Sequence, residues 1–309
     1  MAAATSPARR QARPRALTPA ALARWALPAA SADADKEARG HVLVVAGSYE
    51  MPGAALLAAV AALRGGAGKL TIAAPERVSG GLALAIPEAR VIGLGESRTG
   101  GLLPGGVKAL EAMASKVSAV VFGPGMLDEA RSVRFLKGVL PLFRHSVTVL
   151  DALAMSAVHL GPFDQPVVLT PHAGEMAHLT GMSKEAVSAD PLRIALASAA
   201  QWNACVALKG STTYLVQPDG DTWRFDGGTP GLATSGSGDT LAGLICGLAG
   251  RGAAPLQAAA WGVLLHAQAG HALRRRYGEV GYLARELSAE FPALMEKLLS
   301  PRAGRRTVR

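Results

Sequence analysis

Short apolar segments alternate with alanine- and leucine-rich segments from about residue 40 to residue 300, and this alternation constrains the fold most. Residues 41–46 and 118–122 are apolar and strand-like, whereas residues 51–65 are small and helix-like, with Pro52 near the first turn. Nearly continuous apolar strands separated by helices are typical of a mostly parallel sheet covered on both faces. We therefore predict an α/β protein with such a central sheet.

Polar or glycine-rich segments follow several of the predicted strands. Further strands are predicted at 69–74, 146–150, 167–170, 205–208, 213–216 and 223–225, and C-terminal helices near 239–249, 255–277 and 284–299. Asp151 and the segments 123–125, 171–172 and 209–210 stand at strand ends. Because ligands of such sheets bind beyond the carboxyl ends of the strands, we expect the chemistry to collect along one edge.

The net charge of +9 is concentrated at the two ends of the chain. Residues 1–24 and 301–309 contain no acidic residue, and residues 25–300 are formally neutral. The terminal cations are Arg9, Arg10, Arg13, Arg15, Arg24, Arg302, Arg305, Arg306 and Arg309. We predict disordered basic tails at 1–24 and 301–309 around a single domain at 25–300, with no specific binding of nucleic acid.

Composition excludes several other classes of protein. The apolar runs fall short of the ~20 residues that span a bilayer, so we predict no membrane association. Cys205 and Cys246 lie in apolar segments and indicate buried thiols in a reducing compartment, which favours the cytoplasm. His266 and His271 are five residues apart without the intervening Glu of a zinc-protease helix, and no dedicated metal-ligand set is evident.

The segment Gly231–Gly243 is a glycine- and hydroxyl-rich loop that delivers one carboxylate, Asp239, to the start of an apolar helix. Gly236 and Gly238 lack a Cβ, so backbone N–H groups there can turn toward an anion, and the helix dipole acts at the same point. An acid beside an anion hole suits phosphoryl transfer, in which it accepts a proton from an attacking hydroxyl. Alternatively, Asp239 is only a favourable charge at a helix N-terminus.

Three other motifs, each taken alone, indicate a function less clearly. Residues 65–70 resemble a Walker phosphate loop but lack its first Gly and its Ser/Thr, so we interpret them as a turn. His172, in the segment 170–175, offers a hydrogen-bond donor at the ligand edge or is simply a loop residue before a helix. Lys209 and the hydroxyls that follow it suit phosphate oxygens, although a solvated lysine is the simpler interpretation.

Taken in order, the motifs resemble one known family. They are Gly47–Ala58, 123–125 (Gly-Pro-Gly), 150–152 (Leu-Asp-Ala), Leu169–Glu175, 208–210 (Leu-Lys-Gly) and 235–243. This order resembles the ADP/ATP-dependent NAD(P)H-hydrate dehydratases, a branch of the ribokinase-like superfamily, over residues 38–298. The resemblance implies a three-layer α/β/α sandwich. It also implies phosphorylation by ADP or ATP of the C6 hydroxyl of the S-epimer of NADHX or NADPHX, followed by loss of phosphate to give NADH or NADPH.

The resemblance also implies roles for individual residues. It assigns Asp239 as the base, and Ala54 or Ala55, Gly125, His172 and Asp239 as the surroundings of the hydrated cofactor. The residues that it implies around the nucleotide are Lys209, Gly210, Ser211, Thr212, Thr213 and Gly238, and the 236–239 turn adds Gly236 and Ser237. Mg²⁺ is expected to bridge the phosphates.

The chain departs from the family pattern at two positions. Thr229 stands where Asn is common before the proline, and Ser235 stands where Gly is usual. The epimerase domain that some bacterial members carry is absent from this sequence, so we expect coupling to a separate NAD(P)HX epimerase, and assembly into a homo-oligomer. Two alternatives remain: a ribokinase-like kinase of a hydroxymethylpyrimidine, a thiazole or a sugar alcohol, and a catalytically silent nucleotide-binding module with basic tails for an acidic partner.

Overall fold

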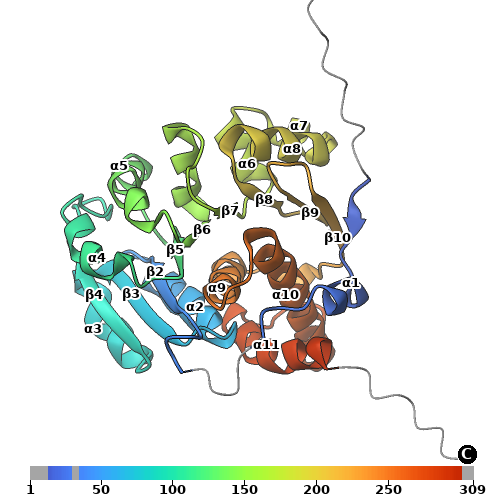
Figure 1. Cartoon of the computed structure of the whole chain (residues 1–309), viewed down its shortest axis with the longest axis horizontal. Coiled ribbons are helices and arrows are strands. Elements are labelled where there is room, and N and C mark those ends of the chain that lie inside the picture. The colour runs from blue at the N-terminus through green and yellow to red at the C-terminus, as the bar shows by residue number, and fades with distance from the viewer. Residues whose placement is uncertain (1–12, 30–34, 301–309) are drawn as a thin grey trace, which may run out of the picture.

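In the computed structural model, which describes residues 13–29 and 35–300, a single ten-stranded sheet runs through the chain (Figure 1). From one edge to the other its strands are β1 (Arg15–Ala16), β10 (Thr222–Asp226), β9 (Thr212–Val216), β8 (Cys205–Leu208), β7 (Val167–Leu169), β6 (Val147–Leu150), β5 (Ala119–Phe122), β2 (His41–Val45), β3 (Lys69–Pro75) and β4 (Ala89–Leu94). All neighbours pair in parallel except β8 with β9 and β9 with β10. The prediction of a mostly parallel sheet is confirmed.

Helices cover both faces of the sheet. One face carries α1 (Pro19–Arg24), α2 (Pro52–Arg64), α3 (Glu76–Ala85), α9 (Ser237–Gly250), α10 (Pro255–Tyr277) and α11 (Ala284–Leu299). The other carries α4 (Gly106–Ala114), α5 (Glu129–Val139), η1 (Leu140–Phe143), η2 (Ala152–Leu160), α6 (Ala173–Thr180), α7 (Lys184–Ala189) and α8 (Pro191–Trp202). A short turn, η3 (Pro230–Leu232), precedes α9. The predicted three-layer α/β/α sandwich is confirmed.

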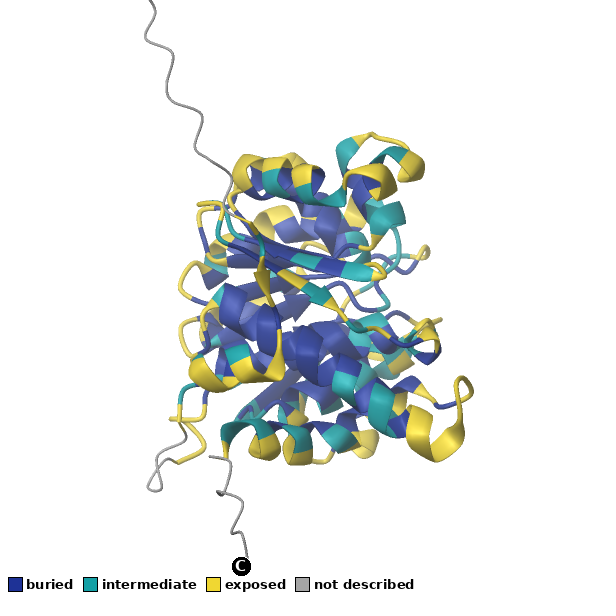
Figure 2. Cartoon of the chain, turned by 90° about the vertical axis from the view of Figure 1, so that its right-hand side faces the viewer, coloured by how far each residue is buried: buried dark blue, intermediate teal, exposed yellow. Residues whose placement is uncertain are grey.

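The strands bury side chains in both directions. Successive side chains of a strand point to opposite faces. In β2, Val42 and Val44 belong to the core beneath α2 and α9, whereas Leu43 and Val45 belong to the core on the other face. Figure 2 shows the buried sheet and central helices between outer helices that are exposed on one side. This double burial explains why the strands are apolar throughout rather than alternating with polar residues.

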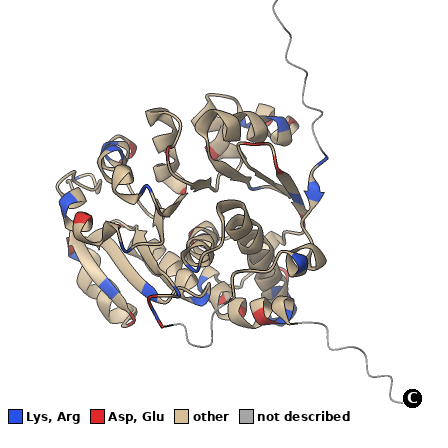
Figure 3. Ribbon diagram, viewed as in Figure 1, with Lys and Arg blue, Asp and Glu red and all other residues tan. Residues whose placement is uncertain are grey.

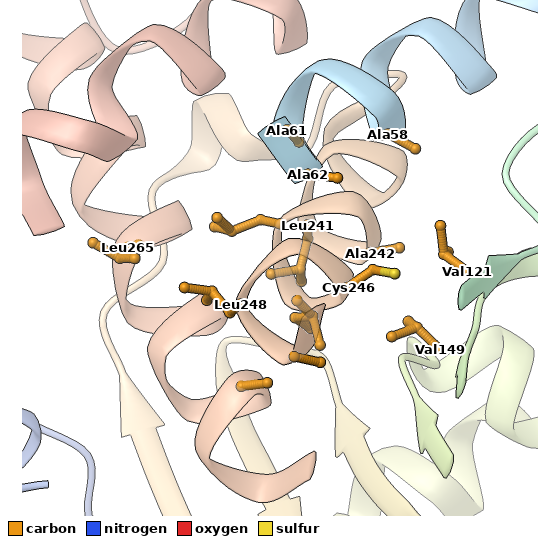
Figure 4. Close-up of a cluster of buried hydrophobic side chains, with 14 of the residues drawn as sticks. Ala58, Ala61, Ala62, Val121, Val149, Leu241, Ala242, Cys246, Leu248 and Leu265 are labelled. Atoms are coloured by element: carbon orange, nitrogen blue, oxygen red, sulfur yellow. The ribbon is translucent and has the colours of Figure 1, made fainter. Parts of the chain in front are cut away.

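Helix α9 is almost completely enclosed, and glycine makes this possible. A Cβ at Gly243 would lie 2.1 Å from the carbonyl oxygen of Ala58, and one at Gly247 would lie 2.3 Å from that of Ala62. The backbones of α2 and α9 therefore touch directly, with small side chains around the contact (Figure 4). Close packing of this kind fixes the direction in which the first turn of α9 points.

The N-terminal segment corrects one prediction. Residues 13–24 were predicted to belong to a disordered tail, but they form β1 and α1, so this part of the prediction is wrong. Arg15 pairs with Asp221 and stacks over the ring of Trp223, whose other neighbour is the stacked ring of Trp25, 5.3 Å away. The sheet edge at β10 is thereby covered. Residues 1–12 and 301–309, which complete the predicted tails, lie outside the described residues.

Charged side chains are dispersed around the described part of the chain. Lys and Arg occur at many separate places, with Asp and Glu among them (Figure 3). None of the helices in the described ranges combines the length and the apolarity that crossing a bilayer requires.

Candidate active site

A cavity of about 900 Å³ opens at the carboxyl ends of β6, β7 and β8, below the first turn of α9. Its charged and histidine lining residues are Asp151, His172, Glu175, Lys209, Asp239 and His266. The loop of residues 228–238 and Phe225 form much of the remaining wall. The strand-end residues that the sequence singled out on these three strands therefore meet around one space.

Lys209 lies at the centre of the polar wall. Its backbone N–H donates to the carbonyl oxygen of Pro171 at 2.7 Å, which extends the pairing of β7 and β8 beyond their ends. Its Nζ is 3.8 Å from Asp151 Oδ1 and 3.8 Å from Glu175 Oε2. The lysine is therefore shared between two carboxylates and is directed into the cavity, not into solvent.

Asp151 is held rigidly at the end of β6. Its Oδ1 accepts a hydrogen bond from Thr170 Oγ1 at 2.6 Å, and the side chain is almost fully buried. The next residue, Ala152, has φ 48°, in the left-handed region that non-glycine residues rarely adopt. A Cβ at Gly123 would lie 1.8 Å from the carbonyl oxygen of Asp151, so the glycine lets the end of β5 approach this strained turn.

His172 caps helix α6 and keeps a donor for the cavity. Its Nδ1 accepts hydrogen bonds from the backbone N–H groups of Gly174 and Glu175, at 3.0 and 3.1 Å. The carboxylate of Glu175 accepts in return from the His172 backbone N–H at 2.7 Å. Because Nδ1 accepts, neutral His172 carries its hydrogen on Nε2. The capping box thus fixes the tautomer and makes the exposed nitrogen a donor.

The first turn of α9 has the geometry of an anion site. Gly236 adopts φ 86° before the helix begins at Ser237, and a Cβ at Gly238 would meet only Lys209 Nζ, at 3.6 Å. The N–H groups of a first helical turn have no acceptor within the helix. The open backbone at Gly238 therefore presents these donors to the same space that Lys209 enters.

Asp239 has an altered acidity. Burial, followed by the nearby charge of Asp151, raises the pKa of Asp239 from 3.8 to about 6, against an opposing effect of Lys209. Glu175 contributes in the same direction as Asp151. A carboxylate with a pKa near neutrality is suited to accept a proton and later to release it.

Most of the predicted site residues line this cavity. They are His172, Lys209, Gly210, Ser211, Thr213, Gly236, Ser237, Gly238 and Asp239. Thr212 is not among the lining residues; its hydroxyl donates to Asp226 on β10 at 2.6 Å.

The small residues predicted near the hydrated cofactor form a separate contact. A Cβ at Gly125, which has φ 66°, would lie 2.6 Å from the Cβ of Ala54, so the turn after β5 packs on the start of α2. Ala55 is completely buried in the core, which leaves Ala54 as the accessible member of the pair. Ala54 and Gly125 do not line the 900 Å³ cavity, but β5 adjoins β6 at the same edge.

Sequence reasoning did not assign functional roles to three residues of the cavity wall. Asp151 was noted at a strand end, and both Asp151 and Glu175 belong to the motifs that resemble the family, but neither was given a role. His266, on the apolar helix α10, was considered only for its spacing to His271, which did not fit a zinc site. All three residues have partners that are distant in the sequence. His266 contacts Ser237, and Asp151 and Glu175 both lie near Lys209.

A family model described as NAD(P)H-hydrate dehydratase matches residues 42–293, which span the sheet from the second residue of β2 to β10 and leave out only β1 and His41. The chain belongs to this family. The resemblance seen in the motifs is therefore confirmed over nearly the whole described fold.

Curated relatives agree with membership of the NAD(P)H-hydrate dehydratase family. An ADP-dependent (S)-NAD(P)H-hydrate dehydratase of Xanthomonas campestris is 49% identical over 286 residues, which cover 93% of this chain and 98% of the relative. A bifunctional NAD(P)H-hydrate repair enzyme of Moorella thermoacetica is 38% identical, and the match covers 92% of this chain but 54% of that longer protein.

Solved structures of similar proteins have the same fold. The ADP/ATP-dependent NAD(P)H-hydrate dehydratase of Bacillus subtilis, co-crystallised with ATP and Mg²⁺, superposes with a TM-score of 0.78 at 29% identity. The match covers 93% of this chain and 99% of that one. A ribokinase-like superfamily protein of Enterococcus faecalis gives a TM-score of 0.80 at 26% identity, covering 93% and 97% of the two chains.

Proposed function

We propose that this protein dehydrates the S-epimer of NADHX and NADPHX to NADH and NADPH, using ADP and releasing AMP and phosphate. The observation that carries the proposal is the position of Asp239, a carboxylate of raised pKa beside the open first turn of α9 and Lys209. The relative from Xanthomonas campestris, which carries this activity in its name, supports the same assignment.

Hydroxide is a poor leaving group and phosphate a good one, which explains the need for a nucleotide. Asp239 accepts the proton of the hydroxyl on C6 of the hydrated ring as that oxygen attacks the terminal phosphorus. The bond between this phosphorus and the bridging oxygen breaks, and AMP leaves when ADP is the donor. Phosphate then departs from C6 with its bonding electrons, C5 loses a proton to water, and the electrons of that C–H bond form the C5–C6 double bond.

The cavity residues divide between the two ligands in this proposal. The nucleotide is held by the 209–213 segment and by the turn that contains Gly236, Ser237 and Gly238. Donors from this turn and from Lys209 stabilise the negative charge on the transferred phosphoryl group. The hydrated nicotinamide lies on the side of Asp239 that faces His172, and extends toward Gly125 and Ala54.

The charges of the site suit a divalent cation. Among the described residues that line the cavity, the carboxylates Asp151, Glu175 and Asp239 face one lysine, Lys209, so a polyphosphate that enters meets excess negative charge. Asp151 and Glu175 are the carboxylates that would hold Mg²⁺, which typically binds through one or two carboxylates, water and substrate phosphates. When bound, Mg²⁺ neutralises phosphate charge. The ATP/Mg²⁺ co-crystal of the Bacillus subtilis relative supports this choice of metal.

The cellular setting is proposed on the same basis. The substrates are small molecules, and we propose functional coupling to an NAD(P)HX epimerase, with which the existence of bifunctional repair enzymes among the relatives is consistent. Cys205 and Cys246 are free and buried, which is compatible with a reducing cytoplasm. We retain a homo-oligomer as the proposed assembly.

The proposal is tested by incubating the full-length protein with NADHX, Mg²⁺ and either ADP or ATP. We expect absorbance at 340 nm to recover as NADH forms, with one phosphate released for each NADH. Omitting the nucleotide is the control and should leave the hydrate unchanged. A stable phosphorylated product without phosphate release would instead indicate a kinase of the same fold and would contradict the proposal.

A further inference from the structure

A histidine on the apolar helix α10 contacts the start of α9 and also lines the cavity. His266 is 8% exposed, and its Nε2 lies 3.0 Å from Ser237 Oγ and 3.0 Å from the carbonyl oxygen of the same serine. Its neighbours in the helix, Leu265 and Ala267, are buried apolar residues. A buried imidazole is costly unless it is hydrogen-bonded, so this double contact with one residue is the interaction that accounts for its place.

The two contacts determine which nitrogen of His266 carries the hydrogen. A carbonyl oxygen can only accept a hydrogen bond, and a lone pair on Nε2 would face the carbonyl lone pairs at 3.0 Å. Nε2 therefore carries the hydrogen and donates it. Burial lowers the pKa of His266 to about 4, so the ring is neutral at physiological pH and has one N–H.

The hydroxyl of Ser237 is oriented as a consequence. The N–H of His266 is directed at both serine oxygens, so Ser237 Oγ accepts and its own hydrogen points away from the histidine. Ser237 lines the cavity at the N-terminus of α9, next to the open backbone of Gly238. Among the described residues, His266 is the side chain within hydrogen-bonding distance of this hydroxyl. The hydroxyl hydrogen is thus available to a ligand in the cavity.

We propose that His266 is a positioning residue that holds the Ser237 hydroxyl as a donor to the terminal phosphoryl group of the bound nucleotide. The identity of this ligand rests on the proposed function, whereas the contact and the tautomer do not. His266 also lines the cavity, but its one N–H is directed at Ser237. It makes the serine a donor and anchors the first turn of α9, whose N–H groups face the same phosphate.

Four variants of the full chain test the proposal. His266→Leu keeps a similar volume but removes the donor, and His266→Gln restores a donor at a similar distance. Ser237→Ala removes the hydroxyl, and the fourth variant combines His266→Leu with Ser237→Ala. ADP and AMP are titrated by calorimetry in Mg²⁺ buffer, so that the readout does not depend on turnover. A hydrogen bond to a charged group corresponds to about a ten- to hundredfold change in affinity. We expect His266→Leu and Ser237→Ala each to weaken ADP about tenfold, with AMP changed less than about twofold.

The remaining variants distinguish positioning from a general structural role. We expect His266→Gln to recover most of the ADP affinity, and the double variant to bind ADP about as weakly as the worse single variant. His271→Gln is the matched control, because His271 lies on the same helix and its Nε2 is 2.9 Å from the carbonyl oxygen of Gly227. This control should retain the ADP affinity of the wild type.

Three outcomes would overturn the positioning role: equal losses for ADP and AMP, additive effects in the double variant, or no rescue by glutamine while the melting temperature is unchanged. Failure of the proposed function looks different. In that case the wild-type protein itself would bind neither nucleotide, or would bind ADP without converting NADHX.

Discussion

The first turn of α9 and the body of the same helix both depend on glycine, but for opposite reasons. At Gly238 an added Cβ would meet only the flexible end of Lys209, at 3.6 Å, whereas at Gly243 it would lie 2.1 Å from the backbone oxygen of Ala58. The glycine of the first turn keeps space open for a ligand, and the glycines of the body allow two helices to touch. The first turn of α9 therefore serves ligand binding and its body serves packing, so substitutions in these two parts should affect different properties.

The largest expected effect is on turnover, from Asp239→Asn. Loss of the base should lower kcat by at least ~10²-fold, because a positioned general base contributes about this much. ADP affinity and the cooperative unfolding transition should persist, since the side chain is not part of the packing of α9 on α2. Steady-state kinetics with NADHX measures kcat, calorimetry measures ADP affinity, and thermal unfolding follows the transition. Turnover close to that of the wild type would remove Asp239 from the mechanism.

The next effect is on stability, from Gly243→Ala in the body of the helix. The new methyl group would overlap the backbone of α2, so we expect a loss of about 3 kcal/mol or more in the free energy of unfolding. This corresponds to a melting temperature lowered by more than about 5 °C. The exposed Gly80 in α3 has nothing within 4 Å of an added Cβ, and Gly80→Ala should leave stability unchanged or slightly improved. Equal stability of the two variants would contradict the close approach of α2 and α9.

Gly238→Ala should have a smaller effect than Gly243→Ala, and on ligand affinity instead of stability. The added methyl group fits beside Lys209, so stability should be retained, but it projects into the approach to the N–H groups of the first turn. We expect the Kd for ADP to rise about tenfold, equivalent to about 1.4 kcal/mol, with an unchanged melting temperature. Calorimetric titration against Gly80→Ala as the control measures this. Unaltered ADP binding would indicate that the turn does not hold phosphate.

The smallest effect concerns the charge of Asp239 and its dependence on pH. The pKa of Asp239 is raised from 3.8 to about 6, so the folded state keeps a proton that the unfolded chain releases. The resulting stabilisation is present below about pH 4 and is lost as the pH rises through 6. Asp239→Asn should therefore melt a few degrees above the wild type at pH 8 and close to it at pH 4. Wild-type turnover should also fall below pH 6, as the base becomes protonated.

The fold and the cavity were predictable from the sequence wherever a local pattern of apolar residues or glycines identified an element and the rules of parallel sheets placed its end. Apolar runs such as 118–122 identified strands, and the carboxyl-edge rule placed Asp151, His172 and Lys209 on one side of the sheet, where they line the cavity. The glycine-rich turn before α9 was evident because few local structures need glycine at alternating positions.

Contacts between distant segments were not predictable in this way. The N-terminal arginines suggested disorder, although Thr18 and Pro19 form a helix start in which the Thr18 side chain accepts the N–H of Ala21. The basic composition of the segment hid this helix start. The two-residue strand β1 is too short to show a sequence pattern and forms only by pairing with β10. His266 was missed for the same reason, since its partner is brought to it by the packing of α10 on α9.

The covering of the sheet edge by β1 has a consequence for the order of biosynthesis. Arg15 and Asp221 are 206 positions apart, so the first described residues leave the ribosome long before the strand on which they dock. The indole of Trp25 stays exposed until Trp223 has been translated, and Leu22 stays exposed until α10 and α11, on which α1 packs, have followed. The segment that forms β1 and α1 is thus among the last to be buried, and a translation pause before residue 222 would prolong its exposure to chaperones and proteases.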